Sequence, residues 1–137
     1  IGIDGLHAFK EGIDDVWENW EEWNETERTI MMRYASRQLN FFQERAHING
    51  KYAEYLKSAG AEEAEIYAQF GKGCGHIAEK LWRICNILGD SLRKGKLSDR
   101  QIDQVNSDLE YIEEETDNLI VLWEELSATL GKSLEIQ

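Results

Sequence analysis

The stretch Phe42-Gln-Glu-Arg-Ala-His-Ile-Asn-Gly-Lys-Tyr-Ala-Glu-Tyr-Leu56 decides the fold class, because it continues the longest regular apolar pattern in the sequence. The spacing of that pattern alternates between three and four residues, which is typical of a helix that packs along one seam against partner helices. Its members are Leu6, Phe9, Ile13, Val16, Trp20, Trp23, Ile30, Tyr34, Phe41, Ile48, Tyr52 and Tyr55. The pattern predicts two helices over residues 5–24 and 26–58, with Thr26 as the cap of the second, or one bent helix over residues 5–58.

Two more helices are predicted downstream. Gly60 suits a helix C-terminus, and a new apolar seam then runs through residues 61–89. A break follows from Gly89 to Leu97, and Ser98-Asp-Arg-Gln101 matches a capping box that opens a last helix over residues 98–131, which Gly131 ends. The sequence therefore predicts one all-α domain, an elongated antiparallel three- or four-helix bundle with coiled-coil-like seams.

The segment Gly71-Lys-Gly-Cys-Gly75 lies inside the predicted third helix. Each glycine in a helix costs about 1 kcal/mol relative to alanine, so three of them need a compensating reason. Close approach of a neighbouring helix or of a ligand would supply one. A phosphate-binding loop is disfavoured, because no strand precedes the segment and no Lys-Ser/Thr follows it.

The charge of the chain restricts its partners. Its 137 residues hold 27 acidic and 15 basic side chains, which gives a net charge of −12. This balance disfavours nucleic-acid binding and docking on an anionic membrane, and it suits a basic protein, a cation or mimicry of nucleic acid. No apolar run is long enough to span a membrane and no signal peptide is evident, so we expect a cytoplasmic protein with free thiols at Cys74 and Cys85.

A candidate partner-binding face lies near the end of the predicted first helix. Trp17, Trp20 and Trp23 are three residues apart, with carboxylates such as Glu21 and Glu22 around them. Tryptophan is enriched at binding hot spots, so this face could dock a basic partner. The alternative is that the tryptophans face the core and the acids form a solvated surface.

A candidate metal site consists of two pairs with helical spacing, Glu44-x-x-His47 and His76-x-x-Glu79. If the helices on either side of Gly60 are antiparallel, both pairs lie at a similar height. Bundles that bind iron or manganese use inward-facing glutamates and histidines of this kind, and zinc would accept the same ligands. The alternative is that all four are ordinary surface residues.

The segment Glu44-Arg-Ala-x-Ile48-x-x-x-Tyr52-Ala53-x-x-Leu56 resembles the helix signature of F-BAR domains. The resemblance implies an elongated helical dimer of the BAR superfamily that shapes membranes through basic residues. In this chain the candidate lipid contacts are Arg45, Lys51, Lys57, Arg93, Lys94 and Lys96.

No sequence pattern indicates nucleophilic catalysis. We therefore expect a non-enzymatic helical interaction or scaffold module without a cofactor, which binds a protein partner or a second copy of itself. The alternatives are a BAR-like membrane-associated scaffold and a ferritin-like bundle that binds iron, manganese or zinc.

Overall fold

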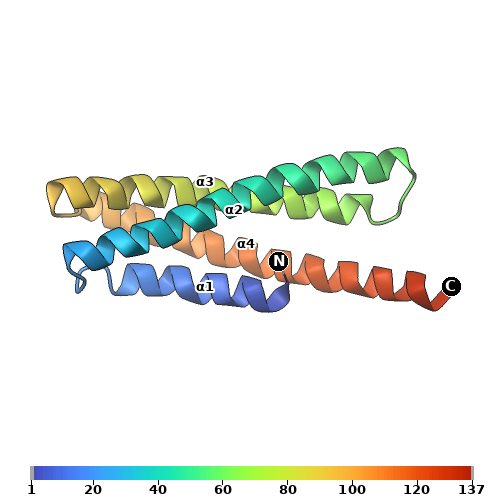
Figure 1. The fold of residues 1–137 in the computed structure, drawn as a ribbon, viewed down its shortest axis with the longest axis horizontal. Coiled ribbons are helices and arrows are strands. Elements are labelled where there is room, and N and C mark those ends of the chain that lie inside the picture. Colours follow the sequence, from blue (N-terminus) through green and yellow to red (C-terminus); the bar gives the residue numbers. More distant parts are fainter. Residues whose placement is uncertain (1, 137) are drawn as a thin grey trace.

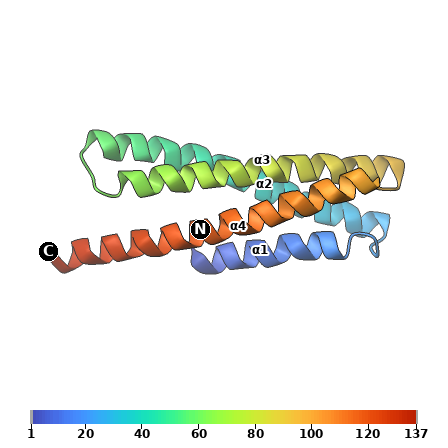
Figure 2. The same cartoon turned by 180° about the vertical axis from the view of Figure 1, so that it is seen from behind.

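The computed structural model describes the backbone of residues 2–136 and the side chains of residues 2–131. This part of the chain forms four helices and no strand: α1 (Ile3–Glu18), α2 (Glu25–Ser58), α3 (Ala64–Lys94) and α4 (Asp99–Ile136). The helices run alternately up and down an elongated bundle (Figures 1 and 2). The predicted all-α fold is confirmed, and the bundle has four helices rather than three.

The shortest helix, α1, covers only half of the bundle. α2 packs along α3, α3 packs on α4, and α1 packs mainly against α4. The ring of Phe9, near the start of α1, lies 4.6 Å from the ring of Phe42 in the middle of α2. The far half of the bundle, which ends at the turn between α2 and α3, therefore consists of three helices (Figure 1).

The break between α1 and α2 falls earlier than the sequence predicts. α1 ends at Glu18, and residues 19–23 form turns. Asn24, rather than Thr26, caps α2: its side chain accepts a hydrogen bond from the Glu27 amide, and the Glu27 carboxylate accepts one from the Asn24 amide. This reciprocal capping box satisfies two amide groups that a helix start leaves without partners.

The other helix boundaries agree with the prediction at the turns and differ at two glycines. Gly60 has a φ of 72°, and Ser98 and Gln101 form the expected capping box. Gly89, however, does not end α3, which continues to Lys94 and is followed by Gly95 with a φ of 80°. Gly131 does not end α4 either, because that helix continues to Ile136.

The predicted seam of α1 is confirmed, whereas that of α2 is displaced. Leu6, Phe9, Ile13 and Val16 are all buried. In α2 the buried positions are Ala35, Phe42, Ala53 and Leu56, and the small residues Ala46 and Gly50 lie against Gly71 of α3. The prediction followed the larger residues and selected the neighbouring face.

The small residues let the backbones of α2 and α3 touch. A Cβ atom added at Gly71 of α3 would lie 3.1 Å from the amide nitrogen of Gly50 and 3.2 Å from the carbonyl oxygen of Ala46. Both neighbours are main-chain atoms of α2 and cannot rotate away. Close approach of a helix therefore explains Gly71, while a Cβ at Gly73 would meet the Leu119 side chain of α4 at 2.6 Å.

We expect Gly71→Ala to destabilise the fold and Gly75→Ala to stabilise it. The first change forces α2 and α3 apart, at a cost of about 1–3 kcal/mol that exceeds the gain in helix propensity of about 1 kcal/mol. A Cβ at Gly75 meets only the Ala46 methyl group, at an ordinary 3.7 Å. Urea unfolding measures both, with Gly50→Ala, which enters open space, as a second stabilising control. Equal stabilisation by Gly71→Ala and Gly75→Ala would contradict the backbone contact.

Candidate interaction surface

Beside its small-residue face, α2 carries a stripe of larger apolar side chains. In the middle of this stripe Tyr34 contacts Gly12 of α1, and Phe41 packs partly against the core. The stripe then continues past the start of α1. There Ile48, Tyr52 and Tyr55 are 42%, 45% and 67% exposed. We call these three residues the uncovered stripe.

The aromatic rings of the uncovered stripe contact one another and a ring of α3. The rings of Tyr52 and Tyr55 are stacked with centroids 6.3 Å apart, and Tyr52 meets Tyr67 of α3 edge-on at 4.9 Å. Burial raises the pKa of the Tyr67 hydroxyl above its ordinary value of 10.0. Rings that are already ordered lose little side-chain entropy when another surface covers them.

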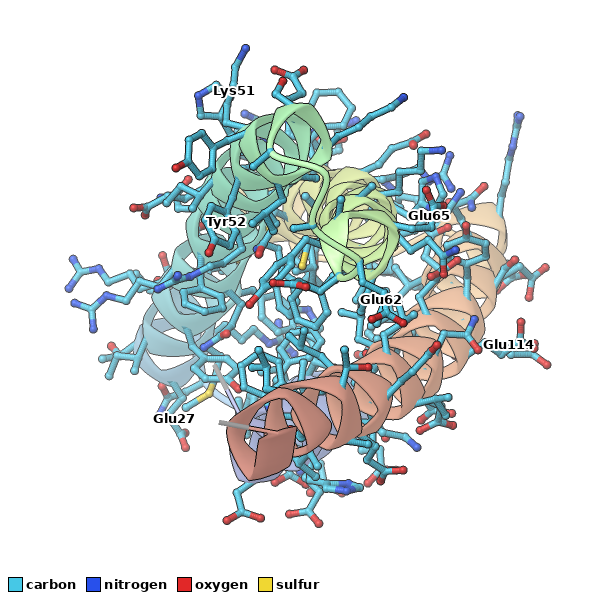
Figure 3. All side chains as sticks on the ribbon, turned by 90° about the vertical axis from the view of Figure 1, so that its right-hand side faces the viewer. Glu27, Lys51, Tyr52, Glu62, Glu65 and Glu114 are labelled. Carbon is cyan, nitrogen blue, oxygen red and sulfur yellow. The ribbon has the colours of Figure 1, made fainter. Side chains whose placement is uncertain are left out.

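The charges of the bundle are segregated between helices. Over its whole length α2 holds six basic and four acidic side chains and α3 holds five basic and three acidic ones, whereas α4 holds two basic and eleven acidic ones. In the end view, Lys51 points outward from α2 and Glu114 points outward from α4 on another side (Figure 3). The uncovered stripe thus lies on one of the two helices that carry a net positive charge in a strongly acidic chain.

The structure does not present the predicted tryptophan face to solvent. Trp20 is fully buried, and its indole nitrogen donates to the Ser91 hydroxyl of α3 at 3.4 Å. Trp17 is half-buried and donates to Asn106 of α4 at 2.7 Å, and Trp23 packs partly against the core. These residues lie at the end of the bundle where α1 is followed by α2. The alternative interpretation, that the tryptophans face the core, holds for Trp20. Only the carboxylates, Glu21 and Glu22, are exposed.

The six basic residues proposed as lipid contacts divide between the two ends of the bundle. Lys51 and Lys57 are near the turn between α2 and α3, where Lys51 lies 3.7 Å from Glu54. Arg45 is half-buried, with its guanidinium 5.2 Å from the Phe41 ring centroid. Arg93, Lys94 and Lys96 lie around the turn between α3 and α4, at the opposite end (Figure 1).

The four proposed metal ligands are not brought together. Glu44, His47 and Glu79 are exposed, and His76 lies against α4, with its Nδ1 atom 3.5 Å from Glu115. In the part of the chain whose side chains are described, no three His, Cys, Asp or Glu residues are grouped as a metal site requires. Glu44 is outside the buried seam, because that seam runs along the adjacent face of α2.

One feature that the sequence analysis missed is Trp82 of α3, which is exposed beside Glu79. It stands alone, as single apolar residues on protein surfaces commonly do. The uncovered stripe differs because its three members are contiguous and extend a packed seam. The alanines at positions 46 and 53, seven residues apart, are the signal that could have identified the true seam of α2.

The interface between α1 and α4 contains two carboxyl groups that share a site. Desolvation raises the pKa of Asp14 to about 6, and a hydrogen bond with the Glu113 carboxyl adds to this effect. One turn away, the Lys10 ammonium lies 3.0 Å from the Asp117 carboxylate. In the folded chain the Asp14 carboxyl is therefore protonated below a pH of about 6, and at pH 7 it is ionised at a cost in stability.

We expect Asp14→Asn to stabilise the protein at pH 7 and to have little effect at pH 4. A raised pKa in the folded state gives stability that is present below the ordinary pKa of 3.8 and is lost as the pH rises through about 6. The gain at pH 7 should be about 1 kcal/mol, because solvent screens this partly exposed pair. Chemical unfolding at both pH values measures it. Glu11→Gln, which neutralises an exposed acid on the same helix, should lack this pH dependence.

Comparison with known proteins finds no matching family model, no similar curated protein and no similar solved structure. Among the helices of the described residues, none has the length and apolar character needed to cross a membrane.

Proposed function

We propose that this chain is a non-enzymatic helical interaction module that associates with a second copy of itself through the uncovered stripe. The observation that carries the proposal is the position of Ile48, Tyr52 and Tyr55. They continue the stripe in which Tyr34 contacts Gly12 of α1, and in the described part of the chain they stay between 42% and 67% exposed. An apolar helix from another molecule would extend the packing that α1 begins.

The side chains of the uncovered stripe suit a protein interface. Tyrosine is enriched at binding hot spots, and burial of apolar area contributes about 25 cal/mol per Å². The Tyr52 and Tyr55 rings are stacked on one another, and Tyr52 also contacts Tyr67. A partner that covers these rings gains apolar burial with little ordering of the surface that receives it.

The segregated charges favour a second copy as the partner. The net charge of −12 opposes self-association when the charges are averaged over the whole molecule. The local charges act in the opposite direction, because the basic helix α2 of one copy can face the acidic helix α4 of the other. Complementary local charges of this kind select the orientation in which two molecules meet.

The alternatives predicted from the sequence have less support. A membrane-shaping surface would place its basic residues on one continuous face, whereas those of this chain divide between the two ends of the bundle. A ferritin-like site would need its carboxylates and histidines to converge, whereas Glu44, His47 and Glu79 are exposed. Self-association is therefore the function that the arrangement supports best.

Sedimentation velocity over a range of protein concentrations tests the proposal. We expect a dimer whose dissociation constant rises at least tenfold in the double variant Ile48→Gln/Tyr55→Gln, because about 1.4 kcal/mol of lost apolar burial corresponds to a factor of ten. Ile30→Gln is the matched control, since Ile30 is exposed on the same helix but far from the uncovered stripe. A parent chain that stays monomeric at high micromolar concentration would remove the proposal.

A further inference from the structure

A hollow of about 340 Å³ lies between α3 and α4. In the described part of the chain, all the residues that line it belong to these two helices, so it is separate from the uncovered stripe of α2. The buried Leu119 and the half-buried Leu122 give it an apolar lining, and Lys72 of α3 and Glu115 of α4 add one charge of each sign. The volume is at the lower end of the range for ligand pockets, which favours a small molecule as the occupant.

The Glu115 side chain reaches from α4 across the hollow to the backbone of α3. A Cβ atom added at Gly73 would lie 3.5 Å from the Oε2 atom of Glu115 and 2.6 Å from the Leu119 side chain. The Glu115 side chain is only 19% exposed. Its carboxylate therefore lies inside the hollow, directly over a residue that has no side chain of its own.

The two oxygens of this carboxylate have different surroundings. The Tyr111 hydroxyl donates a hydrogen bond to Oε1 at 3.2 Å, and the Nδ1 atom of His76 lies 3.5 Å from the same oxygen. Among the residues whose side chains are described, none donates a hydrogen bond to Oε2. Because a largely buried carboxylate is costly unless its oxygens are paired, Oε2 favours a ligand that brings a positively charged donor.

Lys72 places the opposite charge beside this oxygen. It directly precedes Gly73 in α3, lines the same hollow, and forms no ion pair with the described side chains. Lys72 would repel a simple amine, and Glu115 would repel a simple carboxylate. A ligand that carries an ammonium group and a carboxylate on one carbon matches both charges, because both of them lie next to Gly73.

We propose that the hollow between α3 and α4 binds a free α-amino acid with an apolar side chain. The ammonium group of the ligand donates to Oε2 of Glu115, and its carboxylate accepts from the Lys72 ammonium group. The ligand side chain lies against Leu119, Leu122 and Val121, and it covers Val121, which is 60% exposed without a ligand. This small-molecule site is additional to the proposed interaction surface and does not rest on self-association.

A nuclear magnetic resonance titration of the isotope-labelled chain with L-leucine tests the proposal. We expect saturable shifts of the backbone amide signals of Gly73 and Leu119. N-acetyl-leucine lacks the ammonium group and leucinamide lacks the carboxylate, so each should bind at least tenfold more weakly than leucine. Equal binding of either compound overturns the pairing of both charges. The absence of saturable shifts up to the solubility limit of leucine overturns the site.

Two variants assign the ligand contacts. Glu115→Gln and Lys72→Gln each remove one charge, and we expect each to weaken leucine binding at least tenfold. Glu114→Gln is the matched control, because Glu114 is the adjacent acid that points outward from α4 (Figure 3), and its affinity should equal that of the parent chain. Thermal melting by circular dichroism shows which variants fold, and the exposed position of Lys72 gives a measurement even if Glu115→Gln unfolds. Unchanged leucine binding by a folded Glu115→Gln or Lys72→Gln variant overturns the proposal.

Discussion

The contact between the backbones of α2 and α3 at Gly71 is the constraint on which the arrangement depends. Because the two helices touch there, the positions of α2 around the contact, Ala46 and Gly50, hold small residues. Several large apolar residues of α2, among them Ile48, Tyr52 and Tyr55, lie on a neighbouring face. α1 covers that face over only half of the helix, and the remaining half becomes the candidate interaction surface.

The features that the sequence predicts well are those fixed by local chemistry. The capping box of Ser98 and Gln101 and the left-handed turn at Gly60 depend on residues next to one another in the chain. Which face of α2 is buried depends instead on how closely a second helix approaches. The spacing of apolar residues does not encode that distance. The predicted helix end at Gly89 was wrong for a related reason. The helical geometry of Gly89 is maintained by the packing of α3 rather than by local propensity.

The candidate site was predictable only in part. The sequence identifies Ile48, Tyr52 and Tyr55 as members of a seam, but it does not show where the covering helix begins. The tryptophan face failed as a solvent-exposed site because Trp20 fills the end of the core, where Ser91 satisfies its indole. The histidine and glutamate pairs failed to converge because an equal height on two helices does not place side chains on facing sides.

The division of charge between α2 and α4 gives the molecule a permanent dipole across its width, in addition to its net negative charge. Net charge and dipole act differently on two approaching molecules, since the first repels in every orientation and the second attracts in some. Salt weakens the repulsion beyond a Debye length of about 10 Å at 0.1 M, while groups in contact keep much of their attraction. For the self-association that we propose, moderate ionic strength is therefore expected to allow encounters that pure water suppresses.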